Sequence, residues 1–314
     1  MHHKLNLTEN LRLTLFAHSD QELWTIRADG MSNEIASMIS NDQSLFDTYE
    51  YGREERRKIA IKLKHTDQED DNVIFWFGII RDSGPFYYRD TYTPETFAAS
   101  DQKDDRLYKI VLSILAEQSA SFSRMILTLK HSWNYSETNW PYGSIERDKT
   151  VVEYKLRDKA EPGNVNVYYY RNAVLKNGEW QESPEIVAVC VGWGAMDRAI
   201  YKEKLAQMNL LLNEIKASPP KSRECLIKMG YLAYDLSRFV PLQRGSASVA
   251  GSHIRGIGKV KGFSGIGNMH VRGLPFDVYA QMQTNRDQYA IEFCNDVSRD
   301  FNLLQEKELI LKNR

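Results

Sequence analysis

The amino-acid sequence predicts an α+β fold that is mainly helical, with a small antiparallel sheet inserted between helical regions. Apolar residues recur at helical spacing toward both ends of the chain, whereas the middle is rich in Val and Tyr. No internal repeat or low-complexity linker divides the 314 residues, so we expect one two-lobed unit. We place the helical core at roughly 1–145 and 195–314, and the β-rich insertion at 146–194.

The bulk composition excludes several classes of function. The formal net charge is −1, which predicts no bulk attraction to nucleic acid or to an anionic membrane. No apolar run is long enough for a membrane span, and the start lacks the long apolar region of a secretory signal. The three cysteines fit neither a zinc motif nor a disulfide framework, so we expect folding in a reducing compartment such as a cytosol.

The first part of the sequence contains three predicted helical regions and one short apolar run. Asn33–Phe46 has apolar residues at helical spacing, and Gly52–His65 is typical of a charged helix whose arginines and lysines form a solvated face. Asn72–Ile80 is a continuous apolar run that fits a central strand or a buried segment of helix. Asp104–Lys130 has the apolar period of one long helix or of two joined helices.

The middle of the sequence predicts the sheet. Thr150–Arg157, Asn164–Ala173 and Glu185–Trp193 are rich in Val and Tyr, which favour strands. Asn177-Gly178, a typical turn pair, lies between the last two. Together they predict a small antiparallel sheet.

The last part of the sequence is helical again. The apolar spacing of Tyr201–Ile215 indicates a helix that Pro219-Pro220 ends. Ser222 is a good N-cap for the next helix, whose apolar stripe runs to Leu236. A C-terminal helix is expected over roughly Asp287–Leu311.

One stretch has an unusual charge pattern. Leu236–Phe276 contains no Asp or Glu, although 42 acids in 314 residues would put between five and six in these 41 positions. It also holds eight of the 18 glycines. A positive, glycine-rich segment suits a polyanionic ligand, because backbone N–H groups can approach phosphates and cations neutralise their charge. The basic residues of this stretch are Arg238, Arg244, Arg255, Lys259, Lys261 and Arg272, with His253 and His270.

Within this stretch the residues Gly245-Ser246-Ala247-Ser248 are predicted to open a new helix after a loop. Unpaired N–H groups and the positive end of the helix dipole would converge there beside Arg244, which is the geometry of an anion site. The structural alternative is that Ser246 only caps the helix and the arginines are solvated. Two nucleotide-binding motifs are incomplete: Gly256-Ile257-Gly258 lacks a third glycine, and Val260 stands where a P-loop has Ser or Thr.

Two short motifs resemble the AvrB branch of the Fic/Doc/AvrB (Fido) superfamily. Pro241-Leu242-Gln243-Arg244-Gly245-Ser246-Ala247 is similar to a Pro-x-Gln-Arg-Gly-Ser-Ala loop in AvrB effectors of plant-pathogenic bacteria. Asp277-Val278-Tyr279-Ala280 is similar to the Asp-Ile-x-Ala that starts a later helix in that family. The resemblance covers about 60 of the 314 residues and implies a Fido-like helical core.

The resemblance also implies a chemistry. Val240 stands where Fic members have a catalytic histidine, and Arg244 where they have the acid that holds magnesium. Valine cannot abstract a proton and arginine cannot bind Mg²⁺, so magnesium-dependent AMP transfer is not expected. AvrB-type chemistry would move a (deoxy)sugar from a UDP- or dTDP-linked nucleotide sugar to a protein hydroxyl, with neither metal nor cofactor. Asp277 would contact or deprotonate the acceptor hydroxyl, and the diphosphate would be bound by Gln243, Arg244, Gly245, Ser246 and Ala247.

Two other functions and a structural role for Asp277 stay open at this point. The chain fits a nucleotidyltransferase that moves AMP or UMP with an unconventional base, or a pseudoenzyme that binds a nucleotide or a protein without turnover. Asp277 has a helix N-cap as its structural alternative. His253 and His270 are further site candidates because they share the cationic stretch. If the likeness extends to biology, the protein is a bacterial effector, secreted by a specialised system, with a host protein as acceptor.

Overall fold

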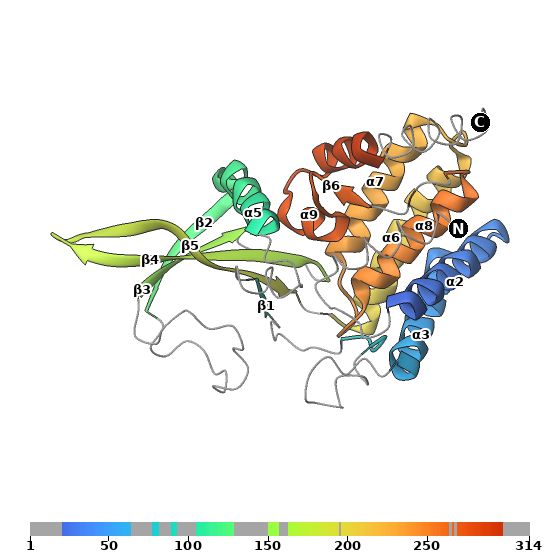
Figure 1. Ribbon diagram of the computed structural model, residues 1–314, viewed down its shortest axis with the longest axis horizontal. Coiled ribbons are helices and arrows are strands. Elements are labelled where there is room, and N and C mark those ends of the chain that lie inside the picture. The colour runs from blue at the N-terminus through green and yellow to red at the C-terminus, as the bar shows by residue number, and fades with distance from the viewer. Residues whose placement is uncertain are drawn as a thin grey trace. The chain divides into compact units, whose positions relative to one another are not determined.

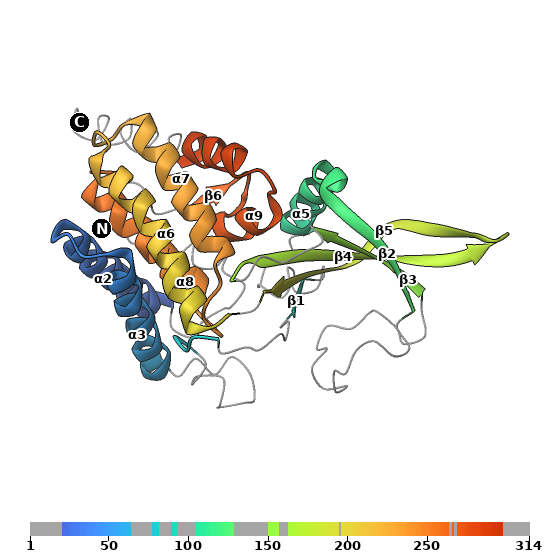
Figure 2. The ribbon, with the colours of Figure 1, turned by 180° about the vertical axis from the view of Figure 1, so that it is seen from behind.

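The chain forms two units, one helical and one built on an antiparallel sheet, as the α+β prediction requires (Figures 1 and 2). The computed structural model describes residues 21–63, 77–81, 89–92, 105–128, 150–156, 163–194, 196–263, 266 and 269–297. The helical unit comprises Met1–Gly84 and Met196–Arg314, and the sheet unit comprises Pro85–Ala195. The sheet unit is therefore larger than the predicted insertion at 146–194, because it also contains one helix and two strands from the region before 146.

The helical unit begins with α2 (Gln21–Ser40) and α3 (Leu45–Leu63). The prediction of one helix over Asn33–Phe46 is wrong, since the chain turns between these two helices, with a φ of 60° at Asp42. A reciprocal cap starts α3: the Asp47 amide donates to the Ser44 hydroxyl at 3.2 Å, and that hydroxyl donates to the Asp47 carboxylate at 2.6 Å. Although the apolar spacing is continuous across this segment, Ser44 and Asp47 start a new helix here.

The predicted helices of the last part are present. They are α6 (Arg198–Ala217), α7 (Arg223–Arg238) and α8 (Ser246–Val260), followed by α9 (Phe276–Met282) and a helix over residues 286–297. The remainder of the predicted C-terminal helix, 298–311, lies outside the described residues. A two-stranded ladder of β6 (His270–Val271) and β7 (Leu274–Pro275) precedes α9. Among the described residues, no helix has the length and apolarity needed to cross a membrane.

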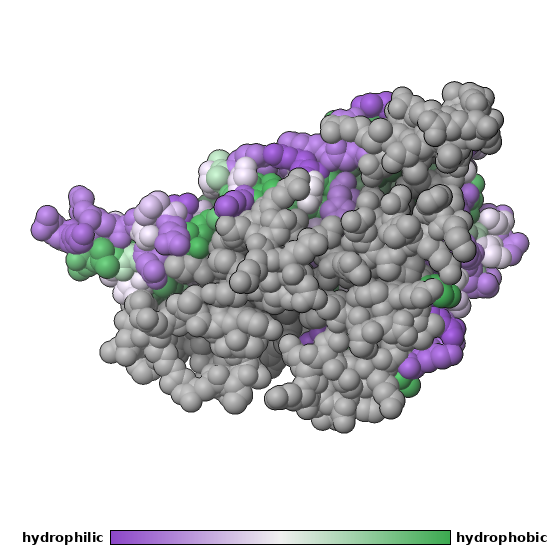
Figure 3. Space-filling view, viewed as in Figure 1, coloured by the Kyte–Doolittle hydropathy of each residue, from purple (hydrophilic) through white to green (hydrophobic). Residues whose placement is uncertain are grey.

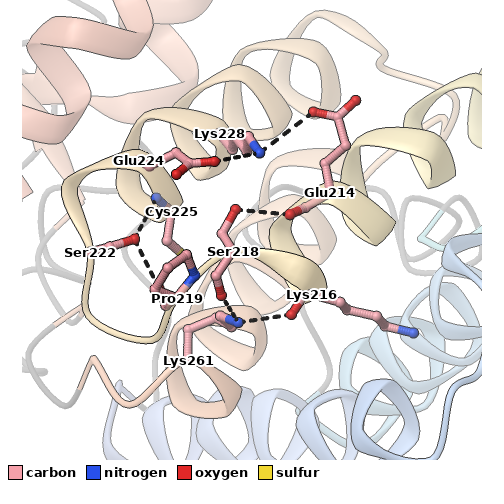
Figure 4. A network of polar contacts seen from close by, with 9 residues as sticks. All are labelled: Glu214, Lys216, Ser218, Pro219, Ser222, Glu224, Cys225, Lys228 and Lys261. Atoms are coloured by element: carbon pink, nitrogen blue, oxygen red, sulfur yellow. Dashed lines mark hydrogen bonds and ion pairs between the residues drawn. The ribbon is translucent and has the colours of Figure 1, made fainter.

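The turn between α6 and α7 is fixed by polar contacts (Figure 4). The Ser222 hydroxyl accepts from the Cys225 amide at 3.1 Å, which confirms Ser222 as the N-cap of α7. The Lys261 ammonium donates to the carbonyls of Lys216 and Ser218 at 3.0 and 2.5 Å, and so satisfies the C-terminal end of α6. The turn thereby ties α6, α7 and the end of α8 together.

Glycines let the helices of this unit approach closely. A Cβ at Gly256 of α8 would lie 3.0 Å from the Ser32 carbonyl oxygen of α2, and one at Gly258 would lie 2.5 Å from the Ile266 side chain. A Cβ at Gly230 of α7 would lie 2.8 Å from the Cα of Ala290. Two glycines of the acid-free stretch, Gly256 and Gly258, are therefore explained by close packing within the helical unit.

The sheet unit has five antiparallel strands in the order β1-β5-β4-β3-β2. Their bounds are β1 (Arg89–Tyr92), β2 (Phe122–Thr128), β3 (Thr150–Leu156), β4 (Val165–Lys176) and β5 (Glu179–Trp193). The last three match the predicted strands, and the Asn177-Gly178 turn joins β4 to β5.

The prediction of helix over the whole of Asp104–Lys130 is wrong in its second half. Helix α5 (Asp105–Glu117) ends at the 3-10 turn η2 (Ser119–Ser121), and β2 follows as an edge strand paired with β3. Residues Phe122–Thr128 alternate between the two faces of the sheet, and this alternation satisfies a helical apolar period almost equally well. The predicted central strand Asn72–Ile80 is described only from Phe77 onward, where it makes isolated bridges to residues 242 and 244.

Beyond Asn172, where its pairing with β3 ends, β4 continues with β5 as a two-stranded arm. Leu175 and Trp180 face each other across this arm and are 57% and 38% exposed. Apolar surface accordingly lies beside polar surface at the end of the hairpin (Figure 3).

The packing at Gly230 gives a stability prediction. Gly230→Ala should lower the free energy of unfolding by about 1–3 kcal/mol, because the new methyl group meets the backbone of Ala290 and not a movable side chain. Gly30→Ala is the matched control, since nothing lies within 4 Å of a Cβ there and the helix should gain about 0.5–1 kcal/mol. Urea denaturation of both variants tests this, and equal shifts in the two would contradict it.

Candidate functional site

A short extended segment lies against the loop that precedes α8. We call Phe77–Arg81 the strap, and Pro241–Arg244 the anion loop. The Gly78 amide donates to the Arg244 carbonyl at 3.2 Å, the Gln243 amide to the Ile79 carbonyl at 2.8 Å, and the Arg81 amide to the Pro241 carbonyl at 2.8 Å. Two segments about 160 positions apart in sequence are thus joined by backbone hydrogen bonds.

Gly245 is the N-cap of α8, so the predicted helix start is confirmed. Its φ of 94° is a left-handed conformation that favours glycine, and it offers the helix no side-chain cap. A Cβ at this position would also lie 2.9 Å from Cγ of Arg56. Ser246 is the first residue of the helix and not its cap, and its hydroxyl accepts from the Leu242 amide at 3.1 Å. The hydroxyl therefore stabilises the loop.

Arginines from three segments gather around this loop. Arg56 of α3 lies against Gly245, and its guanidinium stacks on the Phe77 ring at 4.1 Å. Arg53, one turn earlier in α3, donates to the Gly78 carbonyl at 3.1 Å. Arg81 of the strap donates through Nε to the Val240 carbonyl at 2.7 Å. Arg244 belongs to the anion loop itself, and Arg53 is also paired with the carboxylates of Glu50 and Glu54.

The prediction of a solvated charged face on the helix near Gly52–His65 is therefore wrong for two of its arginines. Arg56 is 3% exposed and the Arg53 side chain is 16% exposed. Arg81, only 6% exposed, was not among the predicted site residues either. The sequence carried a weak signal for Arg53 alone. Glu50 lies three positions before it within a basic run, and this spacing is typical of an ion pair on a helix.

Tyr49 lies beneath this arrangement and is fully buried. Burial raises the pKa of its hydroxyl, while the Ser246 side chain and the positive charge of Arg81 act in the opposite direction. Burial likewise lowers the pKa of Arg81 to about 10, with Tyr49 opposing the shift. Arg81 thus remains a cation at neutral pH. Arg81 and Ser246 stabilise the anion loop through their bonds to the Val240 carbonyl and the Leu242 amide.

Most other cations of the acid-free stretch have structural contacts. Arg238 donates to the carbonyls of Ala280 and Gln281 at 3.2 and 3.0 Å, at the end of α9. Lys259 binds Asp29 of α2 at 2.6 Å, while Lys261 caps α6 as described. Arg255 donates to the Ser32 hydroxyl at 3.4 Å. Structural contacts therefore account for Arg238, Arg255, Lys259 and Lys261 within the helical unit.

His253 is a core residue of α8. Its Nδ1 lies 2.8 Å from the Val249 carbonyl and its Nε2 lies 3.2 Å from the Thr48 hydroxyl. A carbonyl can only accept, so Nδ1 carries the proton, and Nε2 of a neutral ring lies beside the Thr48 hydroxyl, whose one proton is also directed at the Leu45 carbonyl at 3.1 Å. The ring also stacks on Tyr49 at 5.4 Å, and burial lowers its pKa to about 4. These contacts are those of a structural histidine that joins α8 to α3.

Asp277 and His270 belong to a second neighbourhood, formed by β6, β7 and α9, which packs on α7. Asp277 is the second residue of α9 and Pro275 is the N-cap, so Asp277 does not occupy the N-cap position, although its carboxylate accepts from amides of the first turn. Burial raises the pKa of its carboxyl, and the backbone amides of Asp277 and Val278 act in the opposite direction. Burial lowers the pKa of His270. A carboxyl with a raised pKa is suited to accept a proton.

Within the described ranges, no three His, Cys, Asp or Glu side chains are grouped so that they could hold a metal ion.

No protein-family model matches this sequence, and no curated protein matches it. The function has to be inferred from the residues and their geometry.

The burial of His253 predicts a pH dependence of stability. Its pKa is about 4 in the folded state against an ordinary 6.5, so the unfolded chain binds more protons as pH falls through this interval. The free energy of unfolding should therefore decrease below about pH 6.5, by about 2 kcal/mol at pH 5 from this group. Urea denaturation at pH 7 and pH 5 should show a smaller decrease in His253→Gln. The two proteins share every other titrating group, so an equal decrease in both would contradict this role.

Proposed function

We propose that the helical unit is a Fido-like core that binds the diphosphate of a nucleotide sugar at the start of α8. The observation that supports this is that Arg244 immediately precedes Gly245, the N-cap of α8, and that the Arg56 side chain packs against the same glycine. Fixed guanidinium groups and a helix dipole stabilise a doubly charged leaving group without a metal ion. Gln243 and Ala247 are exposed beside this helix start and complete the ligand-binding surface.

The reaction that suits such a site is transfer of a sugar, such as a deoxysugar on UDP or dTDP, to a protein hydroxyl. The bond between the anomeric carbon and the diphosphate oxygen breaks, and its electron pair stays on that oxygen. The acceptor oxygen forms the new bond to the anomeric carbon and gives up its proton to a carboxylate, a role that the resemblance to AvrB assigns to Asp277. Arg244 stabilises the negative charge that develops on the diphosphate.

Two other functions use the same binding site. A nucleotidyltransferase would also need a basic diphosphate site, although Val240 cannot serve as its base. A pseudoenzyme would bind nucleotide without turnover. Intact mass spectrometry of candidate acceptor proteins, incubated with nucleotides and nucleotide sugars, separates the three functions. The acceptor gains the mass of a deoxyhexose, gains that of a nucleoside monophosphate, or gains nothing.

Diphosphate binding should depend on Arg244 and not on a metal ion. Calorimetry should show that UDP or dTDP binds equally well in EDTA, and that Arg244→Ala weakens binding by about 2–3 kcal/mol, the value of a lost charged hydrogen bond. Arg286→Ala is the matched control, because Arg286 pairs with Asp235 in the same unit at 2.6 Å and belongs to neither the strap nor the anion loop. Binding that disappears in EDTA would overturn the metal-free site, and equal losses in both variants would exclude a specific role for Arg244.

Asp277→Asn separates a catalytic carboxylate from a structural one. Because burial already disfavours the charged form of Asp277, an isosteric neutral amide should leave the melting temperature unchanged or slightly raised. An amide cannot accept the acceptor proton, so sugar transfer should fall by roughly 10²–10⁴. A melting curve and a transfer assay on the same preparation test this. Full activity of the variant would remove Asp277 from the mechanism.

A further inference from the structure

A continuous set of polar contacts leads from α6 through α3 to the anion loop. The Tyr201 hydroxyl of α6 donates to Oε1 of Glu50 at 2.6 Å. Arg53 binds both oxygens of that carboxylate, Nε to Oε1 at 3.1 Å and Nη2 to Oε2 at 2.7 Å. Nη1 of Arg53 donates to the Gly78 carbonyl at 3.1 Å, and the Gly78 amide donates to the Arg244 carbonyl at 3.2 Å. The contacts end at the residue immediately before the N-cap of α8.

Gly78 is held by Arg53 from two directions. The Arg53 side chain binds its carbonyl, and a Cβ at Gly78 would overlap the backbone oxygen of Arg53. The φ of Gly78 is 71°, a left-handed conformation that turns its carbonyl toward Arg53 and its amide toward Arg244. The backbone position of Arg244 therefore depends on Gly78 of the strap, and the position of Gly78 depends on Arg53.

The Arg53 guanidinium has two carboxylate partners. Besides Glu50 it contacts Glu54, with Nη1 at 2.9 Å from Oε1, and the Glu54 side chain is the more exposed of the two, at 45% against 26%. Glu50 binds the Nε and Nη2 edge, which leaves Nη1 directed at the Gly78 carbonyl. Without the Glu50 charge, the guanidinium would be drawn toward Glu54, and its bond to Gly78 would weaken.

We propose that Glu50 is a positioning residue for the diphosphate site. Its carboxylate, oriented by Tyr201, fixes Arg53 on the strap, and the strap fixes the backbone from which the Arg244 side chain reaches the ligand. Glu50 itself does not touch the ligand. This role rests on the proposed function, since it concerns the same diphosphate site, and it adds a residue that none of the sequence motifs contains.

The test compares Glu50→Gln with Asp235→Asn. Glu50→Gln keeps an acceptor for Tyr201 and removes the charge that binds Arg53. It should speed hydrogen exchange of the Gly78 amide and weaken UDP binding, each roughly tenfold. Asp235→Asn breaks a similar two-bond arginine pair, that with Arg286, and should change neither quantity. If Glu50→Gln folds poorly, Tyr201→Phe should shift both quantities in the same direction by a smaller factor.

A double variant distinguishes positioning from a general loss of stability. Because Glu50 acts through Arg244, adding Glu50→Gln to Arg244→Ala should weaken UDP binding by less than a further twofold. A further tenfold loss would mean that the two residues act independently, and it would overturn the proposal.

The outcomes also separate this proposal from the proposed function. If the wild-type protein binds neither UDP nor dTDP, the proposed function fails, and Gly78 exchange in Glu50→Gln still decides whether Glu50 holds the strap. If the wild-type protein binds UDP through Arg244, but Glu50→Gln changes neither affinity nor Gly78 exchange, the positioning role of Glu50 alone fails.

Discussion

The pairing of the strap with the anion loop is the interaction on which the charged part of the helical unit depends. Buried guanidinium groups are costly unless their N–H groups meet acceptors. Gly78 of the strap supplies its carbonyl to Arg53, and Val240, the residue before the anion loop, supplies its carbonyl to Arg81. Other backbone groups of the strap and the anion loop hold the two segments together: the amides of Gly78, Gln243 and Arg81 donate to the carbonyls of Arg244, Ile79 and Pro241. Loss of the pairing would expose the loop and leave buried cations without acceptors at the same time.

The acid-free stretch shows how one compositional signal can have two physical causes. Arg238 and Lys261 bind carbonyls at the C-terminal ends of α9 and α6, where the helix dipole favours a cation. Carboxylates at these places would repel the same carbonyls. Arg244 precedes the N-cap of α8, where the local dipole is also positive. An arginine there adds to the positive potential, which is useful for anion binding and unfavourable for the isolated helix.

Much of the fold could be predicted because its signals are local. The cap at Ser222, the turn at Asn177-Gly178 and the start of α8 each depend on a few adjacent residues. Strand β2 could not be distinguished from helix, since its apolar residues fit both periods and its partner β3 lies more than 20 residues later. Arg53, Arg56 and Arg81 were missed for a related reason. Their role depends on a contact between residues 77–81 and 240–244, which no local pattern encodes.

The division of the chain between the two units has a consequence for synthesis on the ribosome. The sheet unit is one continuous stretch, so it can fold as soon as its last strand emerges. The helical unit is discontinuous, and α2 and α3 pack on α8, whose residues emerge roughly 200 positions later. Ribosomes add a few to about 20 residues per second, so the apolar faces of α2 and α3 remain without α8 for on the order of 10–40 s. During that interval they are substrates for cellular chaperones, so the yield of folded protein should depend on chaperone supply more than the final stability would suggest.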